Sequence, residues 1–321
     1  MPVNDIIKTA DYNTLRNSIV QIIGNGSATY GYGQPIRSAA KADDEIISQN
    51  DWDLLRYDIV NARLHQDGAT PTIKDIQEGE LLSFGNNTQY TNLITTATSL
   101  PNRLTVGVGQ FLTEPATTPA GAALTTSRAF SLPSTSWNTL LQCEITVGFT
   151  NSDLCRWFFN SGGEIRITSS RTGGTNNAQN NDWSSLLTSA GQRAFSAQSP
   201  ETGLPSPIGS SAMNARNFYR LTSTYQNYYS LSSSSPYTAN SYNLDAKCDI
   251  ADNRNGTATT VYLRVRFVDN YSDPGDPAPG DAIDGTFSVT VSEKRATGTL
   301  LPSGIFTITR PTYSITALGG T

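Results

Sequence analysis

Hydrophobic residues in the first 70 positions recur three and four residues apart, which is the spacing of one face of a helix. Two ten-residue segments, DYNTLRNSIV from residue 11 and DWDLLRYDIV from residue 51, carry the same Asp, Leu, Arg, Ile and Val at matching positions. A glycine follows each segment, as expected at the end of a helix. The pattern predicts two similar helices at 11–23 and 51–64, the second with a capping box made by Ser48 and Asp51.

Each predicted helix has one apolar face, and the two helices cannot cover both faces by packing on each other alone. The surface that covers them is either the rest of the chain or a partner protein. The arginine that follows the core leucine in each helix is solvated or paired with Asp11 or Asp51, or else faces a partner. The candidate assembly-interface residues are Tyr12, Leu15, Arg16, Ile19, Trp52, Leu55, Arg56 and Ile59.

The sequence also predicts how the chain is divided. A third helix is predicted at 90–100, where the apolar residues share one face and a proline follows the last residue. The segment 113–127, TEPATTPAGAALTTS, is rich in Pro, Ala and Thr and is predicted to be a linker. We therefore expect a helical N-terminal docking module at 1–112 and a β region at 128–321.

Beyond residue 128, apolar and polar residues alternate, which is the pattern of strands with one buried and one solvated side. Asn255-Gly256 between two alternations is a hairpin signal, and short helices are predicted near 153–159 and 183–190. Half-buried strands are typical of antiparallel sheets, so the expected fold class is α+β, mainly β, with an antiparallel β-sandwich or jelly-roll-like region. The clearest alternations lie at 141–149, 242–250, 261–267 and 287–291.

The composition narrows the possible functions. Charged residues make up only 15% of the chain, and its net charge is −5. The chain has no run of Lys or Arg that would form the basic footprint of a nucleic-acid-binding protein. No apolar run approaches the ~20 residues of a membrane span, and the N-terminus has no apolar signal segment. We therefore expect neither nucleic-acid binding nor membrane insertion, and we expect folding in a cytoplasm.

Residues with catalytic or metal-binding potential are few. His65 is the only histidine, and at a helix end it is expected to be solvated or hydrogen-bonded rather than catalytic. Cys143, Cys155 and Cys248 are odd in number and lack CxxC spacing, which favours buried apolar roles over a disulfide framework or a zinc cluster. Nucleotide-binding and nucleophile-elbow motifs are missing from the sequence. The sequence therefore predicts no catalytic residues, no cofactor and no metal.

Two segments have more than one interpretation. The acidic segment 269–285, DNYSDPGDPAPGDAIDG, is predicted to be a solvated loop, with a calcium-stabilised loop as the alternative because aspartates are hard oxygen ligands. The segment 217–231 is rich in tyrosine, and its tyrosines form either an aromatic platform for a sugar or protein partner, or ordinary aromatic packing in a half-buried sheet. The candidate platform residues are Tyr219, Tyr225, Tyr228 and Tyr229.

Several motifs carry a resemblance to a known family. The pattern D-aromatic-N-x-L-R-x-x-I with GYGQ, followed by QNDWDLLRYDIVNARLHQDG, resembles virion structural proteins of contractile-tailed phages that infect marine cyanobacteria. RWFFNSGGEIRITSSRTGG and NNDWSSLLTSAG are similar to segments of such proteins. The resemblance covers the N-terminal 70 residues and about 40 residues of the β region. It implies a component of the particle and carries over no catalytic residue.

The main hypothesis is a non-enzymatic virion structural protein that docks through its helical module and presents a β domain. It would lie in the tail, neck or baseplate, or form a short fibre, after assembly in the host cytoplasm. The alternative is a receptor- or glycan-binding adhesin, and a capsid decoration protein or a polysaccharide depolymerase is less favoured. The expected partners are other virion proteins, copies of the chain in a trimer or ring-bound array, and under the alternative a host surface glycan.

Overall fold

The computed structural model describes residues 9–27, 30–67, 111–131, 137, 139–197, 217–272, 281–296 and 308–320. Contacts divide the chain into two compact units. The helical unit comprises Met1–Leu112, Arg156–Gly163 and Arg295–Thr309, and the β unit comprises Thr113–Cys155, Glu164–Lys294 and Arg310–Thr321. The helical unit therefore takes in a segment from the middle of the chain, which the sequence pattern does not predict.

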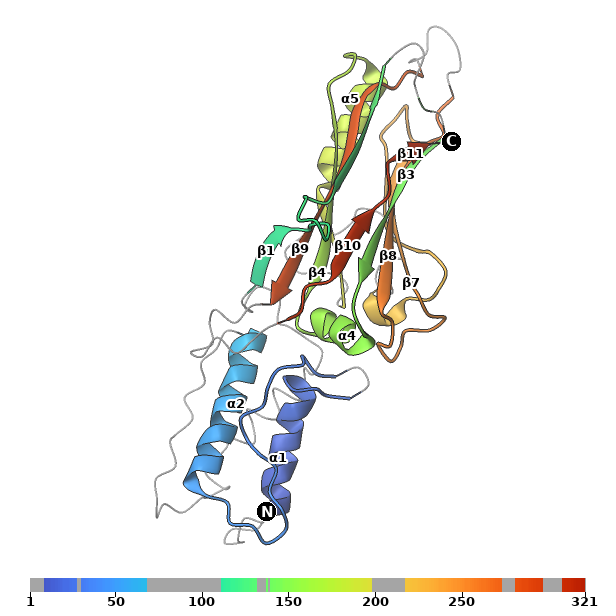
Figure 1. The fold of residues 1–321 in the computed structure, drawn as a ribbon. Helices are drawn as coiled ribbons and strands as arrows, with labels where there is room; N and C mark the ends of the chain where they lie inside the picture. Colours follow the sequence, from blue (N-terminus) through green and yellow to red (C-terminus); the bar gives the residue numbers. More distant parts are fainter. Residues whose placement is uncertain are drawn as a thin grey trace. The chain divides into compact units, whose positions relative to one another are not determined.

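Two helices of similar sequence, α1 (Thr9–Ile22) and α2 (Gln49–Asp67), belong to the helical unit (Figure 1). Equivalent aromatic residues of the repeat meet, since the rings of Tyr12 and Trp52 pack edge to face with centroids 5.4 Å apart. Ser48 and Asp51 form the predicted capping box: Ser48 N donates to Asp51 Oδ2 over 2.8 Å, and Asp51 N donates to Ser48 Oγ over 3.3 Å. The helix predicted at 90–100 lies outside the described residues.

The β unit contains two antiparallel sheets, which confirms the predicted mainly-β fold with some helix (Figure 1). The first sheet has the order β1 (Phe111–Pro115), β9 (Gly285–Ala296), β4 (Glu164–Thr172), β5 (Gln192–Ser196), and β2 (Thr125–Phe130) also pairs with β9. The second has the order β10 (Thr312–Ile315), β3 (Thr139–Gly148), β8 (Thr260–Asp269), β7 (Ser241–Cys248), β6 (Gln226–Ser232), and β11 (Gly319–Gly320) also pairs with β3. The helices α4 (Ser152–Asn160), α5 (Ala178–Ala190) and η2 (Phe218–Arg220) connect strands. The four strands and two short helices predicted from the alternation are all present.

The two sheets share one apolar core. Alternate residues of β3 and β8 are buried, as their alternating sequence predicts. Phe267 of β8 and Phe287 of β9 pack edge to face with centroids 5.3 Å apart, so they join the second sheet to the first. Trp183 of α5 packs against both rings, and this helix therefore contributes to the same core. The arrangement is that of a β-sandwich.

The segment 113–127, predicted to be a linker, instead continues the edge of the first sheet. Leu124 N donates to Ala116 O over 2.7 Å, which folds the segment back on itself. Ala116 N donates to Val291 O over 3.1 Å, and Val291 N donates to Leu124 O over 3.0 Å, which ties both arms to β9. The linker prediction from composition is wrong because proline, which has no N–H to donate, is tolerated in strands at the edge of a sheet.

The Asn255-Gly256 signal lies where expected, between the antiparallel partners β7 and β8, but the turn is longer than two residues. The connection runs from Cys248 to Thr260, the residues that end and begin the two strands. Asn253 organises it, because its Nδ2 donates to Phe218 O over 2.8 Å and its Oδ1 accepts from Ala258 N over 2.9 Å. Gly256 N also donates to Asn253 O over 2.9 Å, so a tight turn lies within this longer connection.

Candidate functional site

In the helical unit, the second half of α4 holds the Gly-rich segment that follows α1. Arg156 donates to the carbonyl oxygens of Tyr30 and Asn25, the latter over 3.1 Å. Trp157 Nε1 also donates to Asn25 O over 3.2 Å, and Asn160 Nδ2 donates to Gly31 O over 3.0 Å. The segments GYGQ (31–34) and RWFFNSGG (156–163) therefore lie against each other although more than 120 residues separate them.

Gly33 of this segment packs directly beneath the Trp157 ring. Its φ is +71°, and a Cβ atom there would lie 2.2 Å from the ring. We expect Gly33→Ala to destabilise the helical unit by more than the roughly 1 kcal/mol that left-handed backbone alone costs an alanine. Gly173→Ala is the matched control, since Gly173 has a φ of +69° and no atom within 4 Å of the same position. Equal losses in the free energy of unfolding for the two variants would contradict the contact with Trp157.

The predicted assembly-interface residues are mostly internal to the helical unit. The structure buries Tyr12, Ile19, Trp52, Leu55 and Ile59, and leaves Leu15, Arg16 and Arg56 half-buried. The chain itself helps cover the helices with the segment 36–41, which supplies the further surface that the sequence required. Ser38 binds both helices, because its N–H and Oγ donate to Asp58 Oδ2 over 2.9 Å and 2.7 Å and its carbonyl accepts from Arg16 Nε over 2.9 Å.

One aromatic residue of α2 remains at the surface. The Tyr57 side chain is 45% exposed. The guanidinium carbons of Arg37 and Arg56 lie 5.3 Å and 5.2 Å from the centroid of its ring, within cation–π range. We call Arg37, Arg56 and Tyr57 the Tyr57 patch. The Arg56 side chain is 20% exposed and its Nε lies 3.6 Å from Asp53 Oδ1, whereas its repeat equivalent Arg16 is bound to Ser38.

In the β unit, the solvent-facing side of the second sheet carries a cluster of charged residues centred on Asp245. Arg264 donates to Asp245 Oδ2 through Nε over 3.0 Å, and Arg266 donates to the same atom through Nε over 2.6 Å. Asn227 Nδ2 donates to Asp245 Oδ1 over 3.1 Å. Burial alone would raise the pKa of Asp245, but these donors outweigh it and hold the pKa below its ordinary value.

A pocket with a volume of about 420 Å³ lies beside this cluster. The Tyr225 hydroxyl donates to Glu144 Oε2, and the guanidinium carbon of Arg264 lies 4.0 Å from the centroid of the Tyr225 ring. Burial and the nearby Glu144 carboxylate raise the pKa of Tyr225, so its hydroxyl stays protonated and remains a donor. The polar lining includes Gln142, Glu144, Tyr225, Arg264 and Thr316.

The four candidate tyrosines do not form one platform. Tyr225 lines the pocket, whereas Tyr228 and Tyr229 are buried and Tyr219 is half-buried within η2. The pairing of β6 with β7 shifts register between Asn227 and Tyr229, so two consecutive tyrosines are both buried. Such a bulge breaks the alternation on which the sequence argument depends. The packing alternative therefore holds for Tyr228 and Tyr229.

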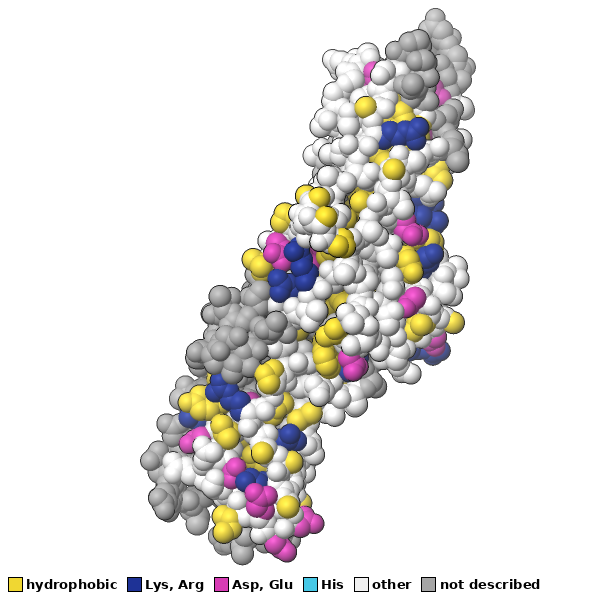
Figure 2. Space-filling model, in the orientation of Figure 1, with side chains coloured by type: hydrophobic (Ala, Val, Ile, Leu, Met, Phe, Trp, Pro, Cys, Tyr) yellow, Lys and Arg dark blue, Asp and Glu magenta, His cyan; other side chains and the backbone are white. Residues whose placement is uncertain are grey.

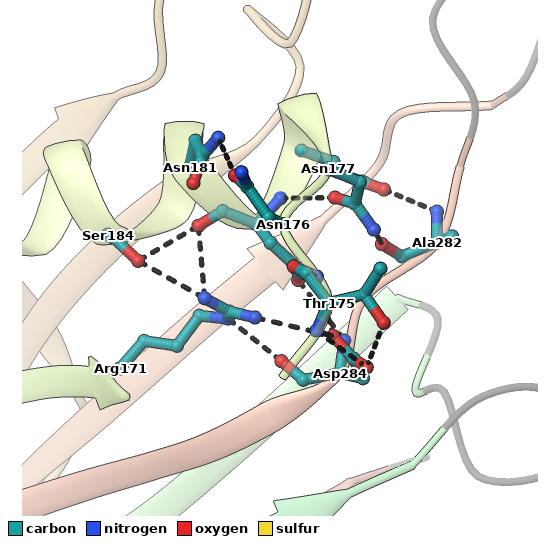
Figure 3. A network of polar contacts seen from close by, with 10 residues as sticks. Arg171, Thr175, Asn176, Asn177, Asn181, Ser184, Ala282 and Asp284 are labelled. Atoms are coloured by element: carbon teal, nitrogen blue, oxygen red, sulfur yellow. Dashed lines mark hydrogen bonds and ion pairs between the residues drawn. The ribbon is translucent and has the colours of Figure 1, made fainter. Parts of the chain in front are cut away.

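Asp284, near the end of the acidic segment, is the centre of a buried polar network (Figure 3). Thr175 donates to its carboxylate through N and Oγ1, each over 2.8 Å, and Asn180 Nδ2 donates to Oδ1 over 2.5 Å. Arg171 Nη2 lies 3.4 Å from Oδ1. Burial would raise the pKa of Asp284, but these donors and the charge of Arg171 hold it below its ordinary value. The network fixes the start of β9 to the turn before α5.

Asp269, at the end of β8, is also buried. Gln179 Nε2 donates to Asp269 Oδ1 over 3.3 Å and lies 3.2 Å from Asp281 Oδ1, while Asp269 Oδ2 has no hydrogen-bond partner among the described residues. Burial first, and then the nearby Asp281, raise the pKa of Asp269 to about 7. The solvated-loop prediction is therefore wrong for Asp269 and Asp284, and residues 273–280 lie outside the described part.

The remaining candidates for chemistry are internal. Cys143, Cys155 and Cys248 are free and buried, which confirms their predicted core role. Burial raises the pKa of the Cys143 thiol to about 12, so the reactive thiolate does not form there at neutral pH. Within the described ranges, no three or more His, Cys, Asp or Glu side chains are grouped so that they could hold a metal ion.

The visible surface carries little charge. On the face drawn in Figure 2, Lys, Arg, Asp and Glu side chains lie in small separate groups among uncharged polar atoms. Among the described residues drawn there, Lys and Arg form no continuous stripe of the kind that binds nucleic acid. Of the helices that the structure describes, none combines the length and apolar character needed to cross a bilayer.

Comparison with known proteins adds no relative to this picture. No family model, no curated protein and no solved structure matches the chain.

Proposed function

We propose that the chain is a non-enzymatic structural subunit of a phage particle. The helical unit docks on neighbouring virion proteins, and the β unit is presented outward from the particle. Copies are related by closed symmetry, as a trimer or a ring-bound array. The observation that supports the proposal is the packing of GYGQ (31–34) against RWFFNSGG (156–163), which unites two of the motifs that resemble phage virion proteins in the helical unit. Because both motifs belong to the helical unit, we expect this unit to make the contact with neighbouring virion proteins.

The Tyr57 patch is the proposed docking contact on this unit. Interface hot spots are enriched in tyrosine and arginine, and this patch presents an exposed tyrosine beside two arginines. The apolar residues of α1 and α2 serve a different purpose, because the helical unit already buries Tyr12, Trp52 and Leu55. Docking therefore uses the surface of α2 rather than its apolar face.

We expect Tyr57→Ala to reduce incorporation of the chain into particles by at least tenfold, because loss of a hot-spot residue costs about 2 kcal/mol or more in binding. The melting temperature should stay the same, since half of the side chain is already solvated. The measurement is quantitative mass spectrometry of purified particles assembled with each variant.

Two further variants sharpen this test. Asn50→Ala, at another exposed position of α2, should incorporate normally. Trp52→Ala should lose incorporation together with a lower melting temperature, because it opens a cavity in the core. Normal incorporation of Tyr57→Ala would contradict docking through this patch.

A further inference from the structure

We infer that the pocket on the second sheet of the β unit binds a neutral saccharide of one or two sugar residues. This inference goes beyond the docking role and does not depend on it, because the pocket lies wholly in the β unit. A volume of about 420 Å³ is within the range of small-ligand pockets, which runs from roughly 300 to 1,000 Å³. The pocket is therefore large enough to hold a compact ligand.

The polar groups of the pocket suit hydroxyl groups. The Glu144 carboxylate accepts two or more hydrogen bonds, the Gln142 amide both donates and accepts, and the Arg264 guanidinium donates in a fixed plane. A sugar presents adjacent hydroxyls, each of which is both donor and acceptor, and a carboxylate forms strong charge-assisted bonds with them. Gln142 and Glu144 are two residues apart on β3, so both side chains leave the same face of the strand.

The site is also held in place before a ligand arrives. Arg264 is fixed by Asp245, and the Tyr225 ring lies over Arg264 with its hydroxyl bonded to Glu144. A side chain that is already ordered loses less conformational entropy on binding. The pocket is therefore preorganised by residues of β3 and β8 and by Tyr225, which directly precedes β6.

The charges in the pocket favour a neutral ligand. The lining carries one carboxylate, Glu144, and one guanidinium, Arg264. Arg264 and Arg266 share the Asp245 carboxylate, so the positive charges of the two arginines are balanced by Asp245 and Glu144 together. The Glu144 carboxylate would therefore oppose a bound anion, and an acidic sugar should bind worse than a neutral one.

The strand edge beside the pocket argues against an extended peptide as the ligand. β10 ends at Ile315 and β11 comprises only Gly319–Gly320, so residues 316–318 interrupt the edge next to β3. Peptides that add a strand need a continuous row of backbone donors and acceptors. A compact ligand suits the interrupted edge better.

The test is saturation-transfer NMR on the full chain with glucose, galactose, mannose and N-acetylglucosamine, and with sialic acid as the anionic comparison. We expect at least one neutral sugar to bind, and sialic acid to bind more weakly or not at all. Gln142→Ala and Glu144→Ala should each weaken that binding at least tenfold without lowering the melting temperature. Thr146→Ala changes the next residue on the same face of β3, which is not part of the lining, and should bind like the parent chain.

Three results would overturn the inference: no binding of any neutral sugar, preference for sialic acid, or unchanged binding by Glu144→Ala. Incorporation of Glu144→Ala into particles is measured in parallel, and we expect it to be normal. If the chain binds no sugar but is incorporated normally, only the saccharide site is rejected. If the chain binds a sugar but Tyr57→Ala is incorporated normally, only the docking contact is rejected.

Discussion

Asp284→Ala is expected to lower the free energy of unfolding of the β unit by about 3–5 kcal/mol, the usual cost of breaking a buried ion pair. The Arg171 side chain is only 4% exposed and would lose its counter-charge. The N–H of Thr175 and the side-chain amide of Asn180 would lose their acceptors as well. Urea unfolding followed by tryptophan fluorescence measures the change, because Trp183 lies in the core of this unit.

Asp252→Ala is the matched control for this prediction. Asp252 also pairs with an arginine, Arg254 at 2.7 Å, but the two side chains are 50% and 81% exposed. Exposed ion pairs contribute little to stability because water screens them, so this variant should unfold almost like the parent chain. If both variants lost the same stability, burial would not be what makes the Asp284 network important.

Asp269→Asn is expected to stabilise the chain by about 4 kcal/mol at pH 8 but by only about 2 kcal/mol at pH 5. The pKa of Asp269 is raised from 3.8 in the unfolded chain to about 7 in the folded one, and each pKa unit corresponds to about 1.4 kcal/mol. The folded state therefore binds the proton more tightly. The contribution of this group is fully present below pH 3.8 and is lost as the pH rises toward 7.

We compare the free energy of unfolding of Asp269→Asn with that of the parent chain at each pH. All other titrating groups are common to both proteins, so the difference reports on the Asp269 carboxyl alone. Urea unfolding from pH 5 to pH 8 gives that difference. A value that stays constant across this range would contradict the raised pKa of the buried Asp269 carboxyl. A chelator added at pH 8 should leave the melting temperature of the parent chain unchanged, and a clear drop would instead favour the calcium-stabilised loop.

Local patterns were enough to predict most of the secondary structure. The helical spacing of Tyr12 and Ile19 found α1, and the alternation in 261–267 found β8, because both depend on burial of one side of a single element. The capping box at Ser48 could be predicted for the same reason, since its partner Asp51 is three residues away. Features determined by neighbours in the sequence could therefore be found without the structure.

Features that depend on distant partners could not be found in this way. Asp284 and Asp269 lie in a segment whose composition is typical of a solvated loop, yet Thr175 and Gln179, about 100 and 90 residues away, bury and bind them. The register shift between Asn227 and Tyr229 buries two consecutive tyrosines, Tyr228 and Tyr229. No pattern within a short window predicts such contacts.

The candidate site shows the same limit. Tyr225 was one of four equivalent candidates in the sequence, and its partner Glu144 is 81 residues away on β3. Thr316, on the other side of the pocket, follows Glu144 by 172 residues. The helical unit likewise depends on Arg156, which comes from a helix that the sequence assigns to the β region. Which candidate residues form a site therefore depends on contacts between distant parts of the chain, which only the structure shows.

We propose that this chain is a structural subunit of a phage particle, docked through its helical unit. Electron cryomicroscopy of intact particles tests it most directly, since it shows both the position and the contacts of every copy. The account predicts symmetry-related copies whose Tyr57 patch is buried against neighbouring virion proteins, with the pocket beside Tyr225 left open to solvent. Particles that lack the chain, or copies held only through the second sheet of the β unit, would contradict it.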